Sequence, residues 1–414
     1  MSKIRLGDIA DIQAGPFGTQ LHKDEYVDKG IPMLNSKNIG NGSIVTSSLD
    51  YVSPSICSRL PNYVLKTGDI LFGRAGTIER HAYLPAQYNG CFQGTNCIRI
   101  RCYDEKKALF ISYFLWTKQV KQTIENSAGG SIQSYITTDL LKSLFVEIPD
   151  NYEEIADLLI ALDNKIENNY KINDNLSQML GLIYEQWFYR FEFPNAQNLP
   201  YKQANGELEW SEKLKRYIPK GWKVQSMMSN DLFSVISSGV ERFTSKKYYA
   251  TADITGSSIG DGCDVEYETR ESRANMQPVL NSVWFAKMKN SVKHLFLNKE
   301  MTPFIESSIL STGFYGLKCS EISFEYAASV VSAPIFESTK DRLSHGATQQ
   351  GIGDDDLANM PLLVPNDTSL SKFHEATKGL YSQISNNILE NKRLIAIRNF
   401  LLPLLMNGQA TIAE

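Results

Sequence analysis

The chain is poor in the residues and runs that mark several common protein classes. It has six cysteines among 414 residues, none of them spaced C-x-x-C, and its five histidines are scattered. This excludes a disulfide scaffold and argues against a structural zinc site. No apolar run approaches the roughly 20 residues that cross a bilayer. The first residues, MSKIRLGDIADI, lack the apolar region of a signal peptide. We therefore expect a cytoplasmic protein with reduced thiols and no membrane contact.

The chain also lacks a large excess of charge of either sign. Lys and Arg total 42 and Asp and Glu total 46, which gives a net charge of -4. A wholly basic protein that coats nucleic acid is excluded, although a local basic face is not. Hydrophobic residues at 42% and charged residues at 21% are ordinary for a globular chain. At about 150 residues per domain, the length allows two or three domains.

The sequence contains neither of two common catalytic motifs. There is no G-x-x-x-x-G-K-[ST] phosphate loop and no Asn-Pro-Pro-aromatic tetrapeptide of amino-methyltransferases. Asp150, Asp163 and Lys165 imitate the paired carboxylates and lysine of a metal-dependent nuclease. Asp163 and Lys165 lie in a stretch with helical periodicity, whereas the nuclease site needs them on a strand. The sequence therefore predicts no catalytic residue.

Two further features are better explained by structure than by chemistry. The run Asp354–Asp356 could suggest a metal site, but its counterpart earlier in the chain keeps one carboxylate, so we interpret it as the start of a helix. His81 and His294 have no plausible partner in the sequence and are expected to be ordinary surface or core histidines. No metal site is predicted.

The chain repeats itself. At an offset of 216, the residues Gly130, Gln133, Ile136, Asp139, Leu141 and Pro149 recur as Gly346, Gln349, Ile352, Asp355, Leu357 and Pro365. At an offset of 218, the residues Ile166, Asn168, Asn169, Asn173 and Leu176 recur as Ile384, Asn386, Asn387, Asn391 and Leu394. Upstream, Ile39, Gly40 and Gly42 are matched to Ile259, Gly260 and Gly262, and DILFGRAG from Asp69 is matched to SVWFAKMK from Ser282.

The repeat predicts an α+β protein of two tandem halves. Each half is a mixed α/β domain with short β-rich runs, followed by a long helix. We place the domains at 1–150 and 216–365, the helices at 151–190 and 366–414, and a linker at 191–215. Within the first domain, the stretch from Leu109 to Ile124 is the clearest helix. If the long helices pack antiparallel as a coiled coil, the domains acquire a pseudo-two-fold arrangement.

Both long helices carry apolar residues at alternating spacings of four and three, which is typical of a coiled coil. The seam is interrupted by Asn169 and Asn173 in the first helix and by Asn387 and Asn391 in the second. In an antiparallel pair Asn169 would face Asn391 and Asn173 would face Asn387, which would fix the helix register. The alternative is a seam shifted by one residue, to Tyr170 and Ile388.

The order of these parts resembles the specificity (S) subunit of a type I restriction-modification system. IRLGDIADIQAGPFG and IPKGWKV look like the openings of that family's two target recognition domains. Gly130-x-x-Gln133 and Gly346-x-x-Gln349 look like the domain ends, and EEIADLLIALDNKIENN and NFLLPLLMNGQ look like its conserved helices. In the second domain, Asn281-Ser282 replaces the family's usual Gly-Asp.

This resemblance implies a non-catalytic subunit that reads double-stranded DNA in two separated, different half-sites. It implies two modification (methyltransferase) subunits that use S-adenosylmethionine, and restriction subunits that use ATP and Mg for translocation and cleavage. No cofactor is expected on this chain. The alternative is a stand-alone DNA-modifying or DNA-cleaving enzyme with a degenerate motif.

Candidate base-reading residues are those whose side chains make paired hydrogen bonds and which lie in Gly- and Asn-rich loops. In the first domain they are Lys37, Asn38, Arg74, Gln93, Asn96 and Gln133. In the second domain they are Lys246, Lys247, Lys287, Lys289, Lys293 and Gln349. Each of them could instead be a loop staple or solvated surface.

Overall fold

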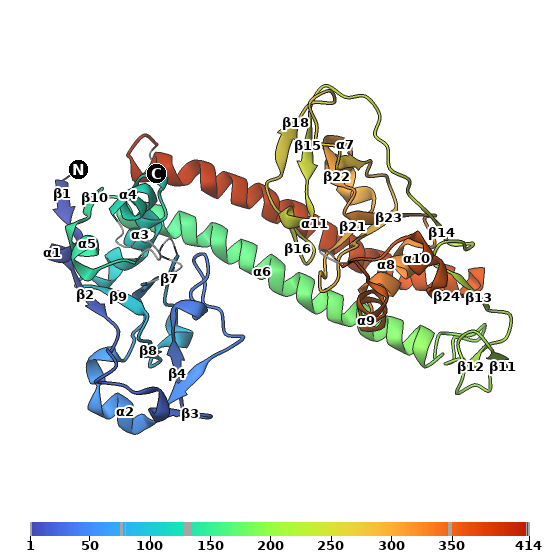
Figure 1. The fold of residues 1–414 in the computed structure, drawn as a ribbon, viewed down its shortest axis with the longest axis horizontal. Helices are drawn as coiled ribbons and strands as arrows, with labels where there is room; N and C mark the ends of the chain where they lie inside the picture. Colours follow the sequence, from blue (N-terminus) through green and yellow to red (C-terminus); the bar gives the residue numbers. More distant parts are fainter. Residues whose placement is uncertain are drawn as a thin grey trace. The chain divides into compact units, whose positions relative to one another are not determined.

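The structure is a computed structural model, and it describes residues 2–74, 78, 80–127, 135–346, 350–410 and 412. The chain divides into two compact units, one comprising Met1–Asn164 with Ile395–Glu414 and the other comprising Lys165–Leu394. Two long helices, α6 (Tyr152–Tyr184) and α11 (Asp367–Met406), each contribute residues to both units (Figure 1).

The first unit is built on two four-stranded sheets. One is antiparallel throughout, in the order β2 (Ala10–Ala14), β9 (Cys97–Cys102), β6 (Ile70–Gly73), β7 (His81–Tyr83). The other has the order β3 (Tyr26–Val27), β5 (Asp50–Val52), β4 (Ile31–Leu34), β8 (Phe92–Gln93), with β4 and β8 parallel. A short pair joins β1 (Ser2–Arg5) to β10 (Phe145–Ile148). The short helices are α1 (Leu6–Ile9), α2 (Pro54–Arg59), α3 (Glu105–Leu115), α4 (Lys118–Ser127) and α5 (Thr138–Ser143).

The expected helix from Leu109 to Ile124 is two helices in the structure. Helix α3 ends at Leu115 and α4 begins at Lys118. Between them the Thr117 hydroxyl donates to the Phe114 carbonyl oxygen at 2.7 Å, which satisfies that carbonyl where the first helix stops. A continuous apolar pattern therefore did not reveal the break.

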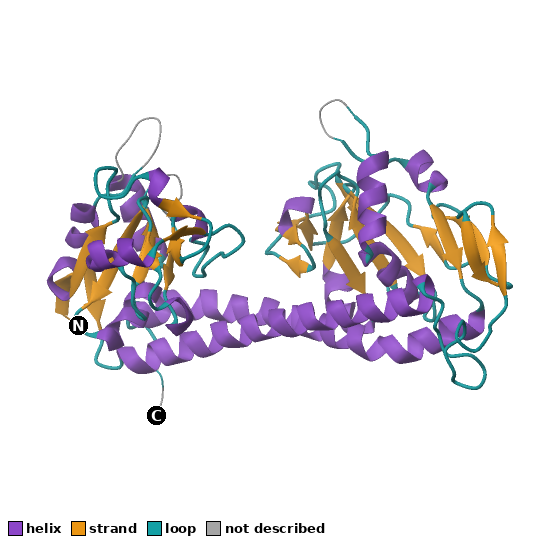
Figure 2. Cartoon of the chain, turned by 90° about the horizontal axis from the view of Figure 1, so that it is seen from below, coloured by secondary structure: helices purple, strands orange, loops and turns teal. Residues whose placement is uncertain are grey.

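The second unit also combines strands and short helices with part of each long helix (Figure 2). Its antiparallel sheet has the order β14 (Phe233–Val235), β23 (Phe314–Cys319), β20 (Ser282–Ala286), β21 (His294–Leu297). Its mixed sheet has the order β18 (Cys263–Val265), β15 (Lys246–Tyr249), β22 (Ser308–Ser311), β19 (Ala274–Met276). The two-stranded pairs are β11 (Leu208–Ser211) with β12 (Arg216–Pro219), β13 (Lys223–Ser226) with β24 (Pro361–Val364), and β16 (Ile254–Thr255) with β17 (Ser258–Ile259). The short helices are α7 (Thr302–Ser307), α8 (Phe324–Ser332), α9 (Pro334–Leu343) and α10 (Asp354–Asn359).

The strand connections show that the repeat is structural. In chain order, both antiparallel sheets place the first strand beside the fourth, the fourth beside the second and the second beside the third. In the mixed sheets, β4 pairs in parallel with β8 as β15 does with β22. The two mixed sheets differ at the outer strand, which is β3 in one unit and β19 in the other. Tandem α+β domains with a shared topology are therefore present.

One part of the predicted repeat alignment is corrected by strand pairing. Ile39 bridges to Ile44, and in the second unit Ile254 pairs with Ile259. The segment starting at Ile39 therefore corresponds to the segment starting at Ile254, whereas sequence matching had aligned Ile39 with Ile259. The similar short glycine-rich sequences that follow Ile39 and Ile259 produced an apparent match that lies five residues beyond the structural equivalent.

The segment interpreted as a linker, 191–215, packs into the second unit. Phe191 and Phe193 are buried, and the Phe193 ring stacks on Trp222 with centroids 5.0 Å apart. The predicted boundary at 215/216 falls in the turn of the β11–β12 hairpin. We therefore correct this boundary: the second domain begins within the assumed linker, because aromatic residues bury there and hold the hairpin in place.

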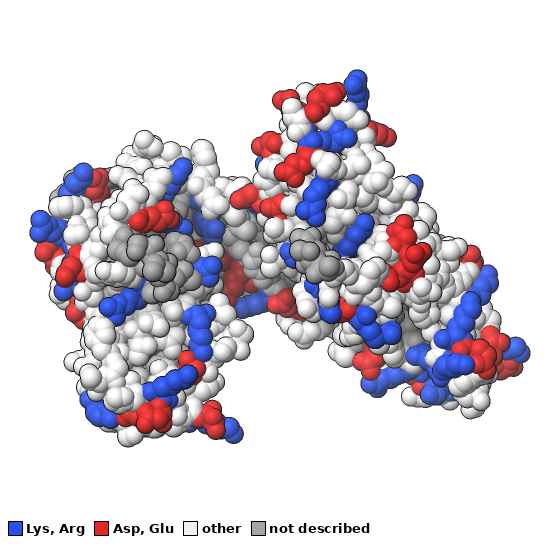
Figure 3. Space-filling model, in the orientation of Figure 1, with Lys and Arg blue, Asp and Glu red and all other residues white. Residues whose placement is uncertain are grey.

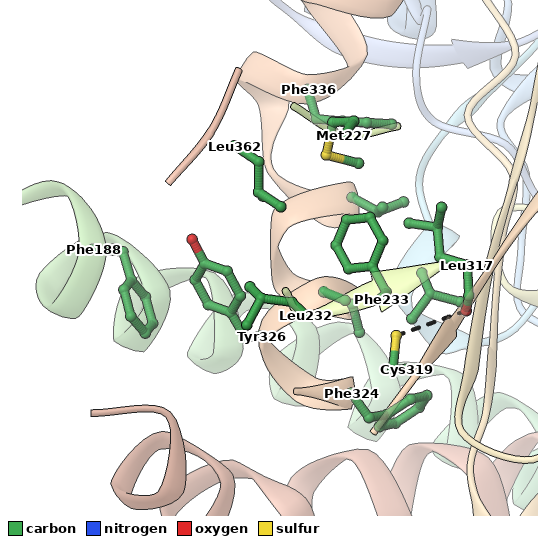
Figure 4. Packing of buried hydrophobic residues seen from close by; sticks show 14 of the residues in the cluster. Phe188, Met227, Leu232, Phe233, Leu317, Cys319, Phe324, Tyr326, Phe336 and Leu362 are labelled. Atoms are coloured by element: carbon green, nitrogen blue, oxygen red, sulfur yellow. Dashed lines mark hydrogen bonds between the residues drawn. The ribbon is translucent and has the colours of Figure 1, made fainter. Parts of the chain in front are cut away.

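The core of the second unit joins its sheet to the end of the long helix. Phe188, which follows α6, points at Tyr326 of α8, with ring centroids 4.6 Å apart (Figure 4). Phe233, Phe324 and Leu317 continue this buried cluster. Such burial contributes roughly 1.5–3 kcal/mol per large apolar side chain, so the helix end is tied to the domain.

Helices α6 and α11 lie antiparallel within each unit. In the first unit the Arg398 guanidinium binds the Asp163 carboxylate at 2.6 Å, and in the second unit Lys165 pairs with Glu390 at 3.1 Å. Apolar seam residues such as Ile166 and Ile384 are buried. None of the helices in the described part of the chain is long and apolar enough to cross a bilayer.

Candidate nucleic-acid interface

In the first unit, three of the predicted residues lie around the ends of β4, β6 and β9. Lys37 and Asn96 line a depression of about 480 Å³ together with Lys23, and Lys37 binds Asp50 at 2.9 Å. Arg74 follows β6, and its backbone N–H donates to the Asn96 carbonyl oxygen at 2.9 Å. The fold therefore brings Lys37, Arg74 and Asn96, far apart in sequence, to one region of this unit.

Arg74 is held by its backbone, and its guanidinium lies over an aromatic ring. Its carbonyl oxygen accepts from the Ile136 N–H at 2.9 Å. The guanidinium carbon lies 5.0 Å from the centroid of the Phe17 ring, and Phe17 is 54% exposed. Stacking on a ring uses the face of the guanidinium and leaves its N–H groups free to bind an acceptor. Such an arginine can bind a guanine edge or a phosphate.

Two predicted readers of the first domain are corrected by the structure. Asn38 is 1% exposed, and its amide nitrogen donates to the Val45 and Ser48 carbonyl oxygens at 2.9 and 3.1 Å. Gln93 is fully buried and donates to the Gln13 carbonyl oxygen at 2.9 Å. Both amides tie loops together, so neither can reach a base edge. The predicted Gln133 and Gln349 lie outside the described residues.

In the second unit, Lys287, Lys289 and Lys293 lie in one loop. This loop, 287–293, connects β20 to β21. The Lys287 ammonium lies 4.2 Å from the centroid of the Tyr315 ring, and burial lowers the pKa of Lys287. Lys289 donates to the Gln350 side-chain oxygen at 3.0 Å, and Lys293 donates to the Thr251 carbonyl oxygen. The loop therefore carries three cations that are oriented by local partners.

Lys246 and Lys247 lie instead on strand β15 of the mixed sheet. Lys247 pairs with Asp264 at 3.3 Å, and the Lys246 ammonium lies 5.8 Å from the centroid of the Phe243 ring. On the face shown in Figure 3, basic and acidic side chains are interspersed in each unit. On this face, local geometry rather than a large basic field would select an anionic partner.

The two buried histidines occupy equivalent positions, which we did not predict from the sequence. His81 pairs across its hairpin with Phe72, and His294 pairs with Phe285. Both histidines thus occupy the same strand position, at the same offset of 213 that relates Arg74 to Lys287. This shared offset was the available signal. His81 stacks between Phe72 and Trp116, and burial lowers its pKa to about 3.

The seam asparagines face each other as the antiparallel register predicted. Asn169 donates to the Asn391 side-chain oxygen at 2.9 Å, and Asn387 donates to the Asn173 side-chain oxygen at 2.8 Å. Tyr170, which defined the alternative seam, is 39% exposed. The seam therefore runs through the asparagines.

The seam bonds have a local two-fold symmetry. Asn391 donates to the Ile166 carbonyl oxygen at 3.2 Å, and Asn173 donates to the Ile384 carbonyl oxygen at 3.4 Å. If each residue of α6 is replaced by the residue 218 positions later on α11, and each residue of α11 by the one 218 positions earlier on α6, each of these two bonds becomes the other. The same exchange relates the two bonds between asparagines. This part of the coil is therefore pseudo-symmetric in its hydrogen bonds as well as its sequence.

The residues that imitated catalytic motifs have structural partners. The Asp163 carboxylate accepts from the Tyr113 hydroxyl at 2.6 Å and also binds Arg398. Asp356 accepts from the backbone N–H of Gly353 at 2.7 Å at the start of α10, as expected of a helix start. Within the described ranges, no group of three or more His, Cys, Asp or Glu side chains could hold a metal ion.

Comparisons with known proteins agree with this architecture. Residues 1–178 match the family described as the type I restriction modification DNA specificity domain. The MjaIX specificity subunit of Methanocaldococcus jannaschii is 25% identical over 433 residues, covering 99% of this chain and 93% of that protein. The HindI specificity subunit of Haemophilus influenzae is 22% identical over 450 residues, covering 90% of this chain and 93% of that protein.

A solved structure shares the fold. The type I restriction-modification S subunit from M. genitalium has a TM-score of 0.53 at 16% identity, covering 97% of this chain and 94% of that one. Residues 1–178 thus match this family's domain model, and the chain is similar over 99% and 90% of its length to two type I restriction enzyme specificity subunits.

Proposed function

We propose that the chain is a non-catalytic subunit that reads a bipartite, asymmetric DNA target, with one domain for each half-site. One observation carries this proposal: the two domains share their strand connections but differ in the side chains after the equivalent strands β6 and β20. Arg74 follows the first strand, and Lys287 with Lys289 and Lys293 follow the second. A common scaffold with different hydrogen-bond donors suits two half-sites of different sequence.

The partners would be two modification subunits, and restriction subunits in the full assembly. Two exposed apolar pairs support a partner that binds twice. Met179 and Leu182 on α6 are 49% and 67% exposed, and Ile397 and Phe400 on α11 are 46% and 68% exposed. These pairs are related by the repeat offset of 218. Residues three apart share one helix face, so each pair offers the same small apolar surface.

The chemistry would belong to the partners. Modification subunits would transfer methyl groups from S-adenosylmethionine to adenine, and restriction subunits would use ATP and Mg. This chain would supply DNA selection in the cytoplasm and bind no cofactor itself. With a net charge of -4, it should bind DNA weakly alone, because phosphate contacts dominate affinity.

We further propose that the helix register sets the accepted spacing between half-sites. Helix α6 has 33 residues, which makes it roughly 50 Å long at 1.5 Å per residue. One turn of DNA is roughly 34 Å, so a rod of this size suits half-sites one to two turns apart. The paired asparagines would keep one register and hence one spacer length.

Titration of labelled site DNA tests the scaffold role. We expect tight, specific binding only when the modification subunits are present, and no methylation or cleavage by the chain alone. Leu182→Asp and Phe400→Asp should each remove one modification subunit from the complex, and native mass spectrometry would measure this loss. Ile322→Asp, at a residue 44% exposed outside both pairs, is the matched control. Equal affinity without partners, or activity of the isolated chain, would favour a stand-alone enzyme.

A further inference from the structure

A lysine is buried beneath the 287–293 loop of the second unit. Lys340, on α9, has a fully buried side chain. Its ammonium lies 2.9 Å from the Ser291 carbonyl oxygen, 3.4 Å from the Ala286 carbonyl oxygen and 2.6 Å from a Glu337 carboxylate oxygen. An ammonium has three protons, and three acceptors surround this one. Two of them belong to the loop and to the strand residue that precedes it.

The counter-charge of Lys340 is connected to the other end of the loop. The second oxygen of Glu337 lies 2.8 Å from Nε2 of His294, the first residue of β21. On the same helix, Asp341 accepts from the backbone N–H of Asn290 at 2.9 Å. Helix α9 therefore holds the loop at its start, its middle and its end.

Tertiary packing alone does not call for this arrangement. Burying an ion pair costs several kcal/mol per charge, and an apolar residue of similar size often stabilises a fold equally well. At the equivalent strand position of the first unit, His81 lies between the rings of Phe72 and Trp116, and its Nε2 lies 2.9 Å from the Ser112 carbonyl oxygen. What the ion pair adds in the second unit is a set of directed bonds to the loop backbone.

We propose that Lys340 is a positioning residue that holds the 287–293 loop in its DNA-reading conformation. The side chains it serves are Lys287, Lys289 and Lys293, whose ammonium groups can bind base edges or phosphates only if the backbone between them is fixed. This inference rests on the proposed function and adds to it. It places the reading of the second half-site in this loop. The specificity of the loop would then depend on Lys340, a residue that does not touch DNA.

The test uses the full chain assembled with its modification subunits. Lys340→Met keeps the length of the side chain and removes the two hydrogen bonds and the ion pair. We expect hydrogen exchange of the Lys287, Lys289 and Asn290 amides to rise by about tenfold or more. Sequencing of methylated sites should then show relaxed choice in one half-site and unchanged choice in the other. Lys378→Met, at an exposed lysine paired with Glu375 on α11, is the matched control and should change neither readout.

A milder pair of variants covers the case in which Lys340→Met does not fold. Asp341→Ala removes only the bond to the Asn290 N–H, whereas Asp341→Asn keeps an acceptor oxygen at that position. The first should loosen the loop and relax the same half-site, and the second should restore both.

Three results would overturn the proposal. These are unchanged exchange in the loop, exchange that rises equally in β20 and β23, and a loosened loop with both half-sites still strictly read. Failure of the wild-type complex to select any two-part site would instead refute the proposed function. In that case the exchange measurement still reports whether Lys340 holds the loop.

Discussion

The buried asparagine pair Asn169–Asn391 gives a prediction that the structure makes quantitative. Asn169 is 1% exposed, and Asn391, at 3% exposed, accepts its amide proton. Asn169→Leu leaves the side-chain oxygen of Asn391 buried without that donor. A stranded buried group costs about 1–3 kcal/mol. In a unit of this size each kcal/mol lowers the Tm by about 2–4 °C.

The double variant Asn169→Leu with Asn391→Leu should behave differently. It leaves no amide stranded and adds apolar contact across the seam. The free energy of unfolding of the double variant should therefore exceed the value expected from adding the two single-variant changes by about 1 kcal/mol or more. Replacing Asn173 and Asn387 as well should raise the Tm above that of the wild type. Because no amide then penalises a sliding helix, the four-leucine chain should also accept several spacer lengths.

Urea unfolding of the wild type, the Asn169→Leu and Asn391→Leu single variants and their double variant measures the coupling energy between the two asparagines. Methylation of DNA with spacers of different length tests the helix register. Asn168→Leu and Asn386→Leu are matched controls, because both residues are exposed and occupy equivalent repeat positions. Each control should change stability by less than about 0.5 kcal/mol. Additive single effects, within about 0.3–0.5 kcal/mol, would refute the pairing argument. One strict spacer for the four-leucine chain would refute the register role.

Three further predictions concern the recognition domains. Replacing residues 1–150 with the equivalent segment of a relative should change one half-site in the sequenced methylation pattern, and a change in both would show that the halves do not read independently. If Arg74 reads a base, Arg74→Ala should cost roughly 1–3 kcal/mol of DNA-binding free energy and relax the choice at one base position. If Arg74 binds a phosphate, affinity should fall for all sequences and the slope of affinity against salt concentration should shrink by about 1. Lys287→Ala is the equivalent test in the second domain. His81, whose pKa burial lowers to about 3, binds no proton in the folded state near neutral pH. Its unfolded form gains one below about pH 6.5, so stability should fall by up to about 1.4 kcal/mol per pH unit as pH drops toward 3. His81→Phe should flatten that slope in pH-dependent unfolding, and an unchanged slope would contradict the burial of a neutral imidazole.

The sequence was sufficient for features that depend on periodicity and on repetition. Alternating spacings of four and three predict the long helices, because residues so spaced lie on one helix face. The matched asparagines predict their own partners, because the antiparallel register that places Asn169 opposite Asn391 also places Asn173 opposite Asn387. The tandem domains followed from the same repeat.

Only the tertiary structure decided which polar loop residues point outward. Asn38 and Gln93 have the residue type and context of base readers, yet both amides donate to carbonyl oxygens of the fold. The Asn38 amide donates to Val45, on the same loop, and the Gln93 amide donates to Gln13, on a strand far away in the sequence. The role of a donor depends on whether an acceptor from elsewhere in the chain lies within hydrogen-bond reach, and local sequence does not encode that distance. The same reason hid Lys340: a lysine on a short helix is ordinarily solvated. It becomes a buried anchor here only because β20 and the following loop bring two carbonyl oxygens, and α9 itself a carboxylate, around one ammonium.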